Sequence, residues 1–328
     1  MGFRISIGKK KIVNLIIKDH VIRFVDLKNT NPPIVQNYGE RYLPAGIIHD
    51  GKIVDHETFE AILEECVSDW KIEKRLVRFI VPDSFVIIRK IAVPLEIDDD
   101  EMHGYIFMEI GSSIHLPFEN PVFDYVRLGQ KEGKQELLLF AGPEEVIKEY
   151  ADALEDAKLE PISADISSLA LFRFYHQQTP DDNQIVMLVQ VDLKSVNICI
   201  FEDKKPVVTR QLMMDVDISK WERGKNHLIL NTYLGDQNDI YHPLDDAYLE
   251  IDRVRNFYNY SLNQGSKLVS KLLLDGDHPW LEEIEEKLRS QFDIPVLRVE
   301  GQTHAVGDAG KIPSSYHLNI GLGLKEVD

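Results

Sequence analysis

Two short apolar runs separated by polar residues open the chain, and the same pattern returns near its middle. Ile12–Ile17 and Val21–Leu27 are rich in β-branched side chains and flank a polar turn at residues 18–20. This arrangement is typical of a β-hairpin. Val186–Phe201 repeats it, with a turn at Lys194-Ser195. We therefore predict two lobes, each opening with a hairpin, and a cleft between them.

Further strands and helices follow each predicted hairpin. After the first hairpin we expect a third strand at Ile34–Tyr42 and a helix from His56 to about Trp70, with Asp55 as its N-cap. The segments expected after the second hairpin are a strand at Val207–Met213, helices at Asp217–Leu234, Asp246–Leu262 and Trp280–Phe292, an acidic loop at 236–245 and a helical tail at Leu318–Val327.

A compact α+β unit is predicted between the two halves, because strand and helix patterns alternate there in short segments. It comprises a strand at Val86–Val93, a helix opened by the acidic residues 98–101 and ending near Ser112, strands at Pro121–Leu128 and Gln135–Phe140, a helix to Ala157 and a strand at Leu159–Ala164. We divide the chain into a first lobe (1–81), an insert domain (82–162), a return to the first lobe with a linker (163–184), and a second lobe (185–328) with a subdomain at 219–264 and a closing helix at 318–328.

Composition narrows the class of protein. The net charge is −18, from 37 basic and 55 acidic residues, which argues against a nucleic-acid-binding protein. Cys66 and Cys199 each lie in an apolar pattern, which indicates buried thiols and a reducing compartment rather than a disulfide framework. No apolar run approaches the ~18 residues of a membrane-spanning helix, and the N-terminus lacks the apolar core of a signal peptide. We expect a cytoplasmic protein.

Self-contained catalytic or metal motifs are missing from the sequence. The eleven histidines form no His-Glu-x-x-His, and neither Cys-x-x-Cys nor Gly-x-Ser-x-Gly occurs. Gly8-Lys9 lacks the upstream glycine and the hydroxyl residue of a phosphate-binding loop, and Gly321-Leu322-Gly323 indicates close packing rather than a nucleotide fingerprint. We assign no catalytic residue and no metal ligand.

The order of the predicted elements, and the residues within them, resemble a known family. The segments that carry the resemblance are Arg23–Leu27, Leu43–Ile53, Glu109–Pro117, Leu159–Ala170 and Gly321–Lys325. Together they are similar to the type IV pilus assembly protein PilM family, relatives of the cell-division protein FtsA. The resemblance implies an α/β, actin-like (ribonuclease-H-like) fold of two lobes, with a small α+β insert domain in the first lobe.

The resemblance also implies a nucleotide site, from which this sequence departs. In the family both hairpin turns carry Asp-x-Gly, whose glycine lets backbone N–H groups approach the ATP phosphates and whose aspartate positions Mg²⁺ and water. Here Ile16 and Lys18 occupy the matching positions of the first turn, and the second keeps Asp192 but has Lys194. The positions that match the family's nucleotide site are Lys18, Asp19, Asp192, Lys194, Ser195, Gly276 and Asp277.

These substitutions favour a degenerate ATPase. A non-glycine residue in a left-handed turn costs roughly 1–2 kcal/mol, so two such turns weaken binding by roughly one to two powers of ten or more. We therefore predict no cofactor and no ATP hydrolysis. The alternative is an actin-like protein that still binds ATP·Mg²⁺ in the interlobe cleft, with Lys18 and Lys194 on the phosphates and Asp192 as the catalytic-side carboxylate.

The function that the resemblance implies is a cytoplasmic scaffold of a type IV pilus, competence or secretion assembly machine. It would bind the N-terminal tail of a PilN-like inner-membrane protein, and so lie at the inner face of the membrane without spanning it. Phe85, Ile87 and Arg89 are candidates to line a groove between the first lobe and the insert domain. Other pilus assembly proteins are further expected partners, nucleic acid is not, and homo-oligomerisation like that of FtsA stays open.

Overall fold

The first lobe is built on a mixed six-stranded sheet. The computed structural model describes residues 11–223, 230–300, 304–305 and 312–326. In this sheet the strand order is β10-β6-β1-β2-β3-β18. Its strands are β1 (Ile12–Lys18), β2 (Val21–Thr30), β3 (Pro33–Tyr42), β6 (Leu76–Ile80), β10 (Glu160–Asp165) and β18 (His304–Ala305). The first three form an antiparallel meander, while β6 and β10 continue the sheet in parallel from β1.

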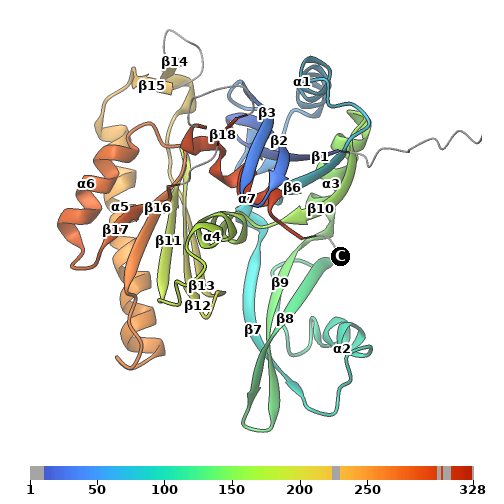
Figure 1. Cartoon of the computed structure of the whole chain (residues 1–328), viewed down its shortest axis with the longest axis vertical. Helices are drawn as coiled ribbons and strands as arrows, with labels where there is room; N and C mark the ends of the chain where they lie inside the picture. The colour runs from blue at the N-terminus through green and yellow to red at the C-terminus, as the bar shows by residue number, and fades with distance from the viewer. Residues whose placement is uncertain (1–10, 224–229, 301–303, 306–311, 327–328) are drawn as a thin grey trace, which may run out of the picture.

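Helices cover both faces of this sheet (Figure 1). Helices α1 (His56–Asp69) and α3 (Glu144–Asp156) cover one face, and α4 (Ser167–Gln178) and α7 (His317–Gly323) cover the other. Leu15 packs into the core on the first face and its neighbour Ile16 into the core on the second. Burial of both faces explains why β1 is an unbroken apolar run, without alternating polar residues.

The second lobe repeats the arrangement around a five-stranded sheet of order β13-β12-β11-β16-β17. Its strands are β11 (Val186–Val191), β12 (Ser195–Glu202), β13 (Lys205–Met213), β16 (Lys271–Asp275) and β17 (Val296–Arg298). Helices α5 (Asn238–Asn256) and α6 (Leu281–Gln291) pack on one face. The other face meets α4, where the rings of Phe172 and Phe201 stack with centroids 3.8 Å apart. Helix α4 therefore packs against the sheets of both lobes.

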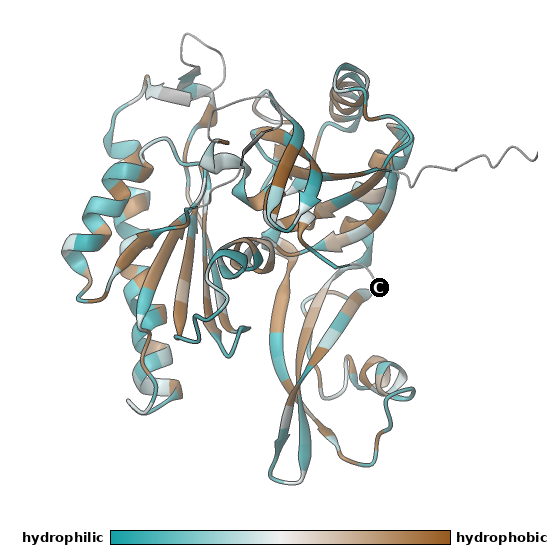
Figure 2. Cartoon of the chain, in the orientation of Figure 1, coloured by the Kyte–Doolittle hydropathy of each residue, from teal (hydrophilic) through white to brown (hydrophobic). Residues whose placement is uncertain are grey.

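The insert domain projects from the first lobe as a three-stranded sheet of order β7-β9-β8 (Figure 1). Its strands are β7 (Ile87–Pro94), β8 (Pro121–Lys131) and β9 (Lys134–Pro143). Helix α2 (Met102–Glu109) covers one face, and its Met102 and Ile106 are fully buried against Leu137 and Leu139. Hydrophobic residues concentrate on the strands of the two lobe sheets, while the tip of the β8–β9 hairpin is hydrophilic (Figure 2). The short elements are β4 (Ile48–His49), β5 (Lys52–Ile53), η1 (Asp83–Phe85), η2 (Ile218–Lys220), β14 (Trp221–Arg223), β15 (Leu230–Tyr233), η3 (Phe257–Leu262) and η4 (Ser314–Tyr316).

Several element predictions in the second lobe are wrong. The helix expected at Asp217–Leu234 is instead a two-stranded ribbon, β14 with β15, stabilised by the cross-strand rings of Trp221 and Tyr233, whose centroids lie 5.2 Å apart. Helix α5 begins at Asn238 rather than Asp246, because Pro243 is accommodated inside the helix. Aromatic pairing between strands and tolerance of a proline both depend on neighbours in space.

Helix ends also differ from expectation elsewhere. Helix α2 begins at Met102, after the acidic run at 98–101, and ends at Glu109 rather than near Ser112. The closing helix α7 ends at Gly323; residues 327–328 of its predicted range, like Gly8-Lys9, lie outside the described residues. No helix in the described ranges combines the length and the apolar character needed to cross a bilayer.

Candidate functional site

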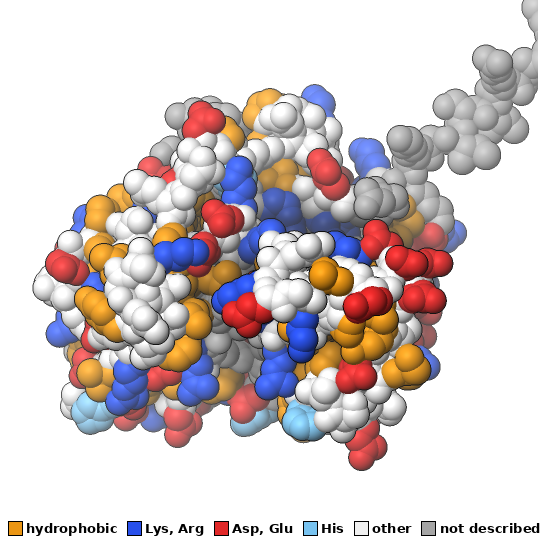
Figure 3. Space-filling view, turned by 90° about the horizontal axis from the view of Figure 1, so that it is seen from below, with side chains coloured by type: hydrophobic (Ala, Val, Ile, Leu, Met, Phe, Trp, Pro, Cys, Tyr) orange, Lys and Arg blue, Asp and Glu red, His pale blue; other side chains and the backbone are white. Residues whose placement is uncertain are grey.

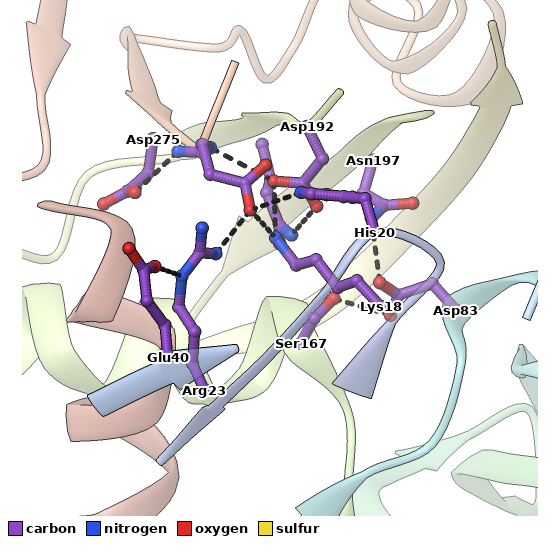
Figure 4. A network of polar contacts seen from close by, with 12 residues as sticks. Lys18, His20, Arg23, Glu40, Asp83, Ser167, Asp192, Asn197 and Asp275 are labelled. Carbon is purple, nitrogen blue, oxygen red and sulfur yellow. Dashed lines mark hydrogen bonds and ion pairs between the residues drawn. The ribbon is translucent and has the colours of Figure 1, made fainter. Parts of the chain in front are cut away.

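The cleft between the lobes gathers three polar turns from distant parts of the chain (Figure 4). These are the β1–β2 turn after Lys18, the β11–β12 turn at 192–194, and the loop that follows β16 at Gly276. Because β1, β11 and β16 each end at the cleft, their carboxyl ends bring these turns together. Of the seven residues matched to the family's nucleotide site, five contact one another across the cleft: Lys18, Asp19, Asp192, Lys194 and Asp277. Ser195 begins β12 beside them, and Gly276 packs against Val191 of its own lobe.

Lys18 lies between two carboxylates of the second lobe. Its Nζ is 2.8 Å from Oδ1 of Asp192 and 3.0 Å from Oδ2 of Asp277. Burial alone would lower the pKa of Lys18, but the two carboxylates outweigh it and raise that pKa above its usual value. Lys18 is therefore a partly buried, charged ammonium that bridges the two lobes.

Asp277 receives two further groups from the first lobe. Its Oδ2 accepts a hydrogen bond from Arg23 at 2.5 Å and lies 3.3 Å from Nε2 of His20. Burial disfavours its charged form, but Lys18, His20 and Arg23 together hold the pKa of Asp277 well below its usual value. Arg23 also donates from Nε to Glu40 at 2.9 Å, so its guanidinium is paired on two sides.

The charged form of Asp192 is stabilised less than that of Asp277. Gln190 donates to its carboxylate at 2.5 Å, and the backbone N–H of Asp277 donates at 3.3 Å. Burial nevertheless raises the pKa of Asp192, because Lys18 offsets only part of the desolvation. The carboxylate kept from the family pattern thus depends on Lys18 to stay ionised.

Lys194 and Asp19 make a second contact across the cleft. Nζ of Lys194 lies 3.7 Å from Asp19 and 3.6 Å from Asp50. The Asp19 carboxylate also accepts hydrogen bonds from the backbone N–H groups of Asp50 and Gly51, at 2.8 and 3.0 Å. Asp19 therefore stabilises the turn between β4 and β5, and Ser195 begins β12 beside it.

Asp83 makes a third contact and was missed by the sequence analysis. Its carboxylate accepts hydrogen bonds from Ser167 at 2.5 Å and from Asn197 of the second lobe at 2.8 Å. Burial raises the pKa of Asp83 to about 6. The sequence feature that indicates a role for Asp83 is an acidic residue shortly after the buried strand β6 and Pro82, where the end of a strand reaches the cleft.

Gly276 is required by close packing. Its φ is +136°, and a Cβ at this position would lie 1.9 Å from the carbonyl oxygen of Val191. The same carbonyl accepts a hydrogen bond from the N–H of His278 at 3.2 Å. The glycine that resembles a nucleotide turn therefore lets the loop after β16 lie against β11.

The residues of this cleft do not fit ATP·Mg²⁺. The cavity lined by the two hairpin turns holds about 70 Å³, whereas ligand sites typically occupy about 300–1,000 Å³. Both lysines are paired with carboxylates, and the Lys18 ammonium lies where a cation bound by Asp192 and Asp277 would have to lie. Within the described ranges, no group of three or more His, Cys, Asp or Glu side chains could hold a metal ion.

A larger groove of about 420 Å³ lies where the insert domain meets the two lobes. Its apolar lining includes Val86, Val122, Phe123, Val126, Phe140, Ile147, Ile166 and Leu169. Its charged residues are Arg173, Lys204, Lys205, Lys325, Asp124 and Asp165. Lysine and arginine side chains also gather near the middle of the face shown in Figure 3. The charge around this groove therefore differs from the acidic average of the chain.

The three groove candidates from the sequence lie elsewhere. Phe85 belongs to η1 and packs against the core of the first lobe. Ile87 lines a neighbouring hollow with Asn197 and Thr209. Arg89 donates to the carbonyl of His115 at 2.7 Å, inside the insert domain. None of the three lines the apolar groove. The residues that do line it come from β8, β9, α3, β10 and α4 and from Lys204–Pro206 of the second lobe, and only tertiary packing brings these segments together.

Comparison with known proteins gives one family and several similar folds. Residues 15–215 match the family described as Type IV pilus assembly protein PilM. A structure described as the PilM–PilN type IV pilus biogenesis complex has a TM-score of 0.78 at 18% identity, covering 97% of this chain and 100% of that one. No curated protein matches the sequence.

Two further structures are similar in fold. The cytoplasmic domain of EpsL, an inner-membrane component of the type II secretion system of Vibrio cholerae, has a TM-score of 0.51 at 10% identity and covers 97% of this chain and 96% of its own. The ethanolamine utilization protein EutJ of Carboxydothermus hydrogenoformans has a TM-score of 0.52 at 11% identity, with 96% and 89% covered. These likenesses confirm the predicted two-lobed, actin-like fold.

Proposed function

This chain belongs to the type IV pilus assembly protein PilM family, and from that membership we propose that it is a scaffold of a pilus, competence or secretion assembly machine. Its ligand is the N-terminal tail of a PilN-like inner-membrane protein. A solved structure with a similar fold, at a TM-score of 0.78, is itself described as a PilM–PilN complex. Binding such a tail holds the protein at the inner face of the membrane.

The observation that carries this proposal is the apolar groove between the insert domain and the lobes. Val122 and Val126 on β8 are 46% and 42% exposed, which is unusual for valine side chains in a sheet and leaves apolar surface for a ligand. Strand β8 is also an edge of its sheet, and an edge strand is where an extended peptide can add by backbone pairing. An extended tail with apolar side chains matches both features.

The interlobe cleft supports a function without ATP hydrolysis. Catalysis would need a metal and a free carboxylate near the phosphates. Asp192 and Asp277 are instead paired with Lys18, and burial disfavours the charged form of Asp192. We therefore propose that ATP is neither a cofactor nor a substrate. The alternative, binding of ATP·Mg²⁺ in the cleft, predicts thermal stabilisation by millimolar Mg-ATP.

Calorimetric titration with a synthetic peptide of the cytoplasmic N-terminal tail of the PilN-like protein from the same genome tests the proposal. We expect saturable binding by the wild type and a loss of at least about tenfold in affinity for Val122→Asp, because a charge would be buried in the groove. The control is Val54→Asp, since Val54 is 61% exposed and is not among the residues that line the groove. Absence of binding by the wild type, or equal weakening by both variants, contradicts the proposal.

A further inference from the structure

Three separate polar contacts join the first lobe to the second across the cleft. Lys18 and its neighbours bind Asp192 and Asp277, Lys194 lies against Asp19 and Asp50, and Asp83 accepts from Asn197. We call these ten residues the interlobe clamp: Lys18, Asp19, His20, Arg23, Asp50, Asp83, Asp192, Lys194, Asn197 and Asp277. Both lobes supply cations and anions, so the clamp is complementary in charge.

The central part of the clamp is buried, which makes it difficult to open. The side chains of Arg23 and Asp277 are only 4% and 2% exposed. Separating a buried pair leaves charges without partners in a low-dielectric environment, where the loss greatly exceeds that of a surface ion pair. Lys18 is the key residue, because its single ammonium contacts two carboxylates of the other lobe and is the cation of the clamp that lies next to Asp192.

Two lobes that face each other with buried carboxylates can stay together only when a cation lies between them. In this chain the Lys18 ammonium already supplies the positive charge between Asp192 and Asp277, and the remaining cavity is about 70 Å³. We propose that the interlobe clamp keeps the two lobes closed without any nucleotide, so that the closed conformation is built into the sequence.

Closure has a consequence for the apolar groove, and this step rests on the proposed function. The groove is lined by Val122 and Phe140 of the insert domain and also by Lys204–Pro206 at the β12–β13 turn of the second lobe. Lys205 donates to the carbonyl of Arg127 at 3.1 Å, which ties that turn to the insert domain. Rotation of the second lobe would move one wall of the groove. The clamp therefore holds the groove in the shape that receives the tail.

Small-angle X-ray scattering of the wild type, with and without Mg-ATP, tests closure directly. We expect both profiles to agree with the closed structure and to be the same within error. A profile of the wild type that is more open than the structure, or that contracts when Mg-ATP is added, overturns the proposal. This measurement does not depend on any variant folding, and it can fail while peptide binding succeeds.

A pair of variants separates opening from a general loss of stability. Lys18→Met removes the bridging ammonium, and Arg75→Met removes a partner of Asp26 that lies within the first lobe at 2.6 Å. Both variants leave a buried carboxylate without its cation, so both should melt at lower temperature. Only Lys18→Met should increase the radius of gyration, because Lys18 bridges the two lobes whereas Arg75 and Asp26 both belong to the first lobe.

Hydrogen exchange gives a local measure of the same opening. The N–H of Asp277 donates to Asp192 and the N–H of His278 donates to Val191, both within the second lobe at the wall of the cleft. Opening of the cleft admits water to these amides, so their exchange reports on it. In Lys18→Met we expect their exchange to be about 100-fold faster than in the wild type, and peptide affinity to fall. Equal exchange and equal radii in Lys18→Met and Arg75→Met would show that the clamp does not hold the lobes.

Discussion

Gly276→Ala is a sharp test of how the loop after β16 is held in the cleft. The substitution adds a Cβ at φ +136°, 1.9 Å from the carbonyl oxygen and 2.6 Å from the carbonyl carbon of Val191. Both atoms belong to the backbone of a buried strand, so a side chain cannot rotate away to make room. Strain at this φ costs roughly 1–2 kcal/mol, and overpacking adds roughly 1–3 kcal/mol.

Two other glycines separate these contributions. Gly129 has the same φ of +136° and Gly265 has a φ of +78°, and neither has another atom within 4 Å of an added Cβ. We expect Gly129→Ala and Gly265→Ala to lose only the backbone contribution of roughly 1–2 kcal/mol. Gly265 lies in the same lobe as Gly276, so it also controls for separate unfolding of the insert domain.

The assay is calorimetric unfolding of the three variants and the wild type. The additional roughly 1–3 kcal/mol in Gly276→Ala corresponds to a melting temperature roughly 2–12 °C below that of either control. Equal melting temperatures for all three variants would refute the reasoning, since they would show that contact with Val191 does not require a glycine. Normal stability of Gly276→Ala would also refute the backbone strain.

Three further predictions follow from burial and capping. Burial raises the pKa of the Cys66 thiol to about 12 and raises the pKa of the Cys199 thiol as well. Neither thiol should therefore react with Ellman's reagent at pH 8 until the protein is unfolded. Rapid reaction of the native protein would contradict this prediction. Because burial raises the pKa of Asp83 to about 6, the folded protein keeps a proton that the unfolded chain releases near pH 4, and its stability falls as pH rises from about 4 to 6. Urea unfolding should show Asp83→Asn gaining stability relative to the wild type across that pH range. A difference in unfolding free energy between the two proteins that does not change with pH would exclude the mechanism. Asp55 is the N-cap of α1, and its carboxylate accepts a hydrogen bond from the N–H of Thr58 at 3.1 Å. Asp55→Ala should therefore lower the melting temperature, whereas Glu57→Ala, two residues further along in the first turn, should leave it nearly unchanged.

Local patterns were sufficient to predict the elements that neighbours in sequence specify. The two hairpins, the helix α1 after Asp55 and the strands β7, β8 and β9 of the insert domain follow from periodicity, β-branching and caps within short windows. The helix and strand predicted at the end of the insert domain, α3 and β10, instead pack in the first lobe, because their partners there are α1 and β6. The ribbon β14–β15 was missed because its stability comes from Trp221 packing on Tyr233, Trp280 and His278. Those contacts join segments that no local window contains.

The apolar groove shows the same division. The sequence predicts a groove between the first lobe and the insert domain, whereas the apolar groove of the structure also has Lys204–Pro206 of the second lobe in its wall. Position in the chain indicates Phe85, Ile87 and Arg89. The lining depends instead on which faces of β8, β9 and α4 remain uncovered after packing. Strand alternation predicts two faces for each strand, and only the assembled sheet decides which of them a neighbour covers.

The sequence by itself determined that the two hairpin turns carry Lys18 and Lys194 where the family carries glycine, because residue identity at a turn is a local property. Only the tertiary structure decided that Lys18 meets Asp192 and Asp277, the latter 259 positions along the chain. The pairing depends on three strand ends converging at one cleft and on the burial that excludes water there. A buried ion pair is formed by both conditions together, and neither can be read from residues adjacent in sequence.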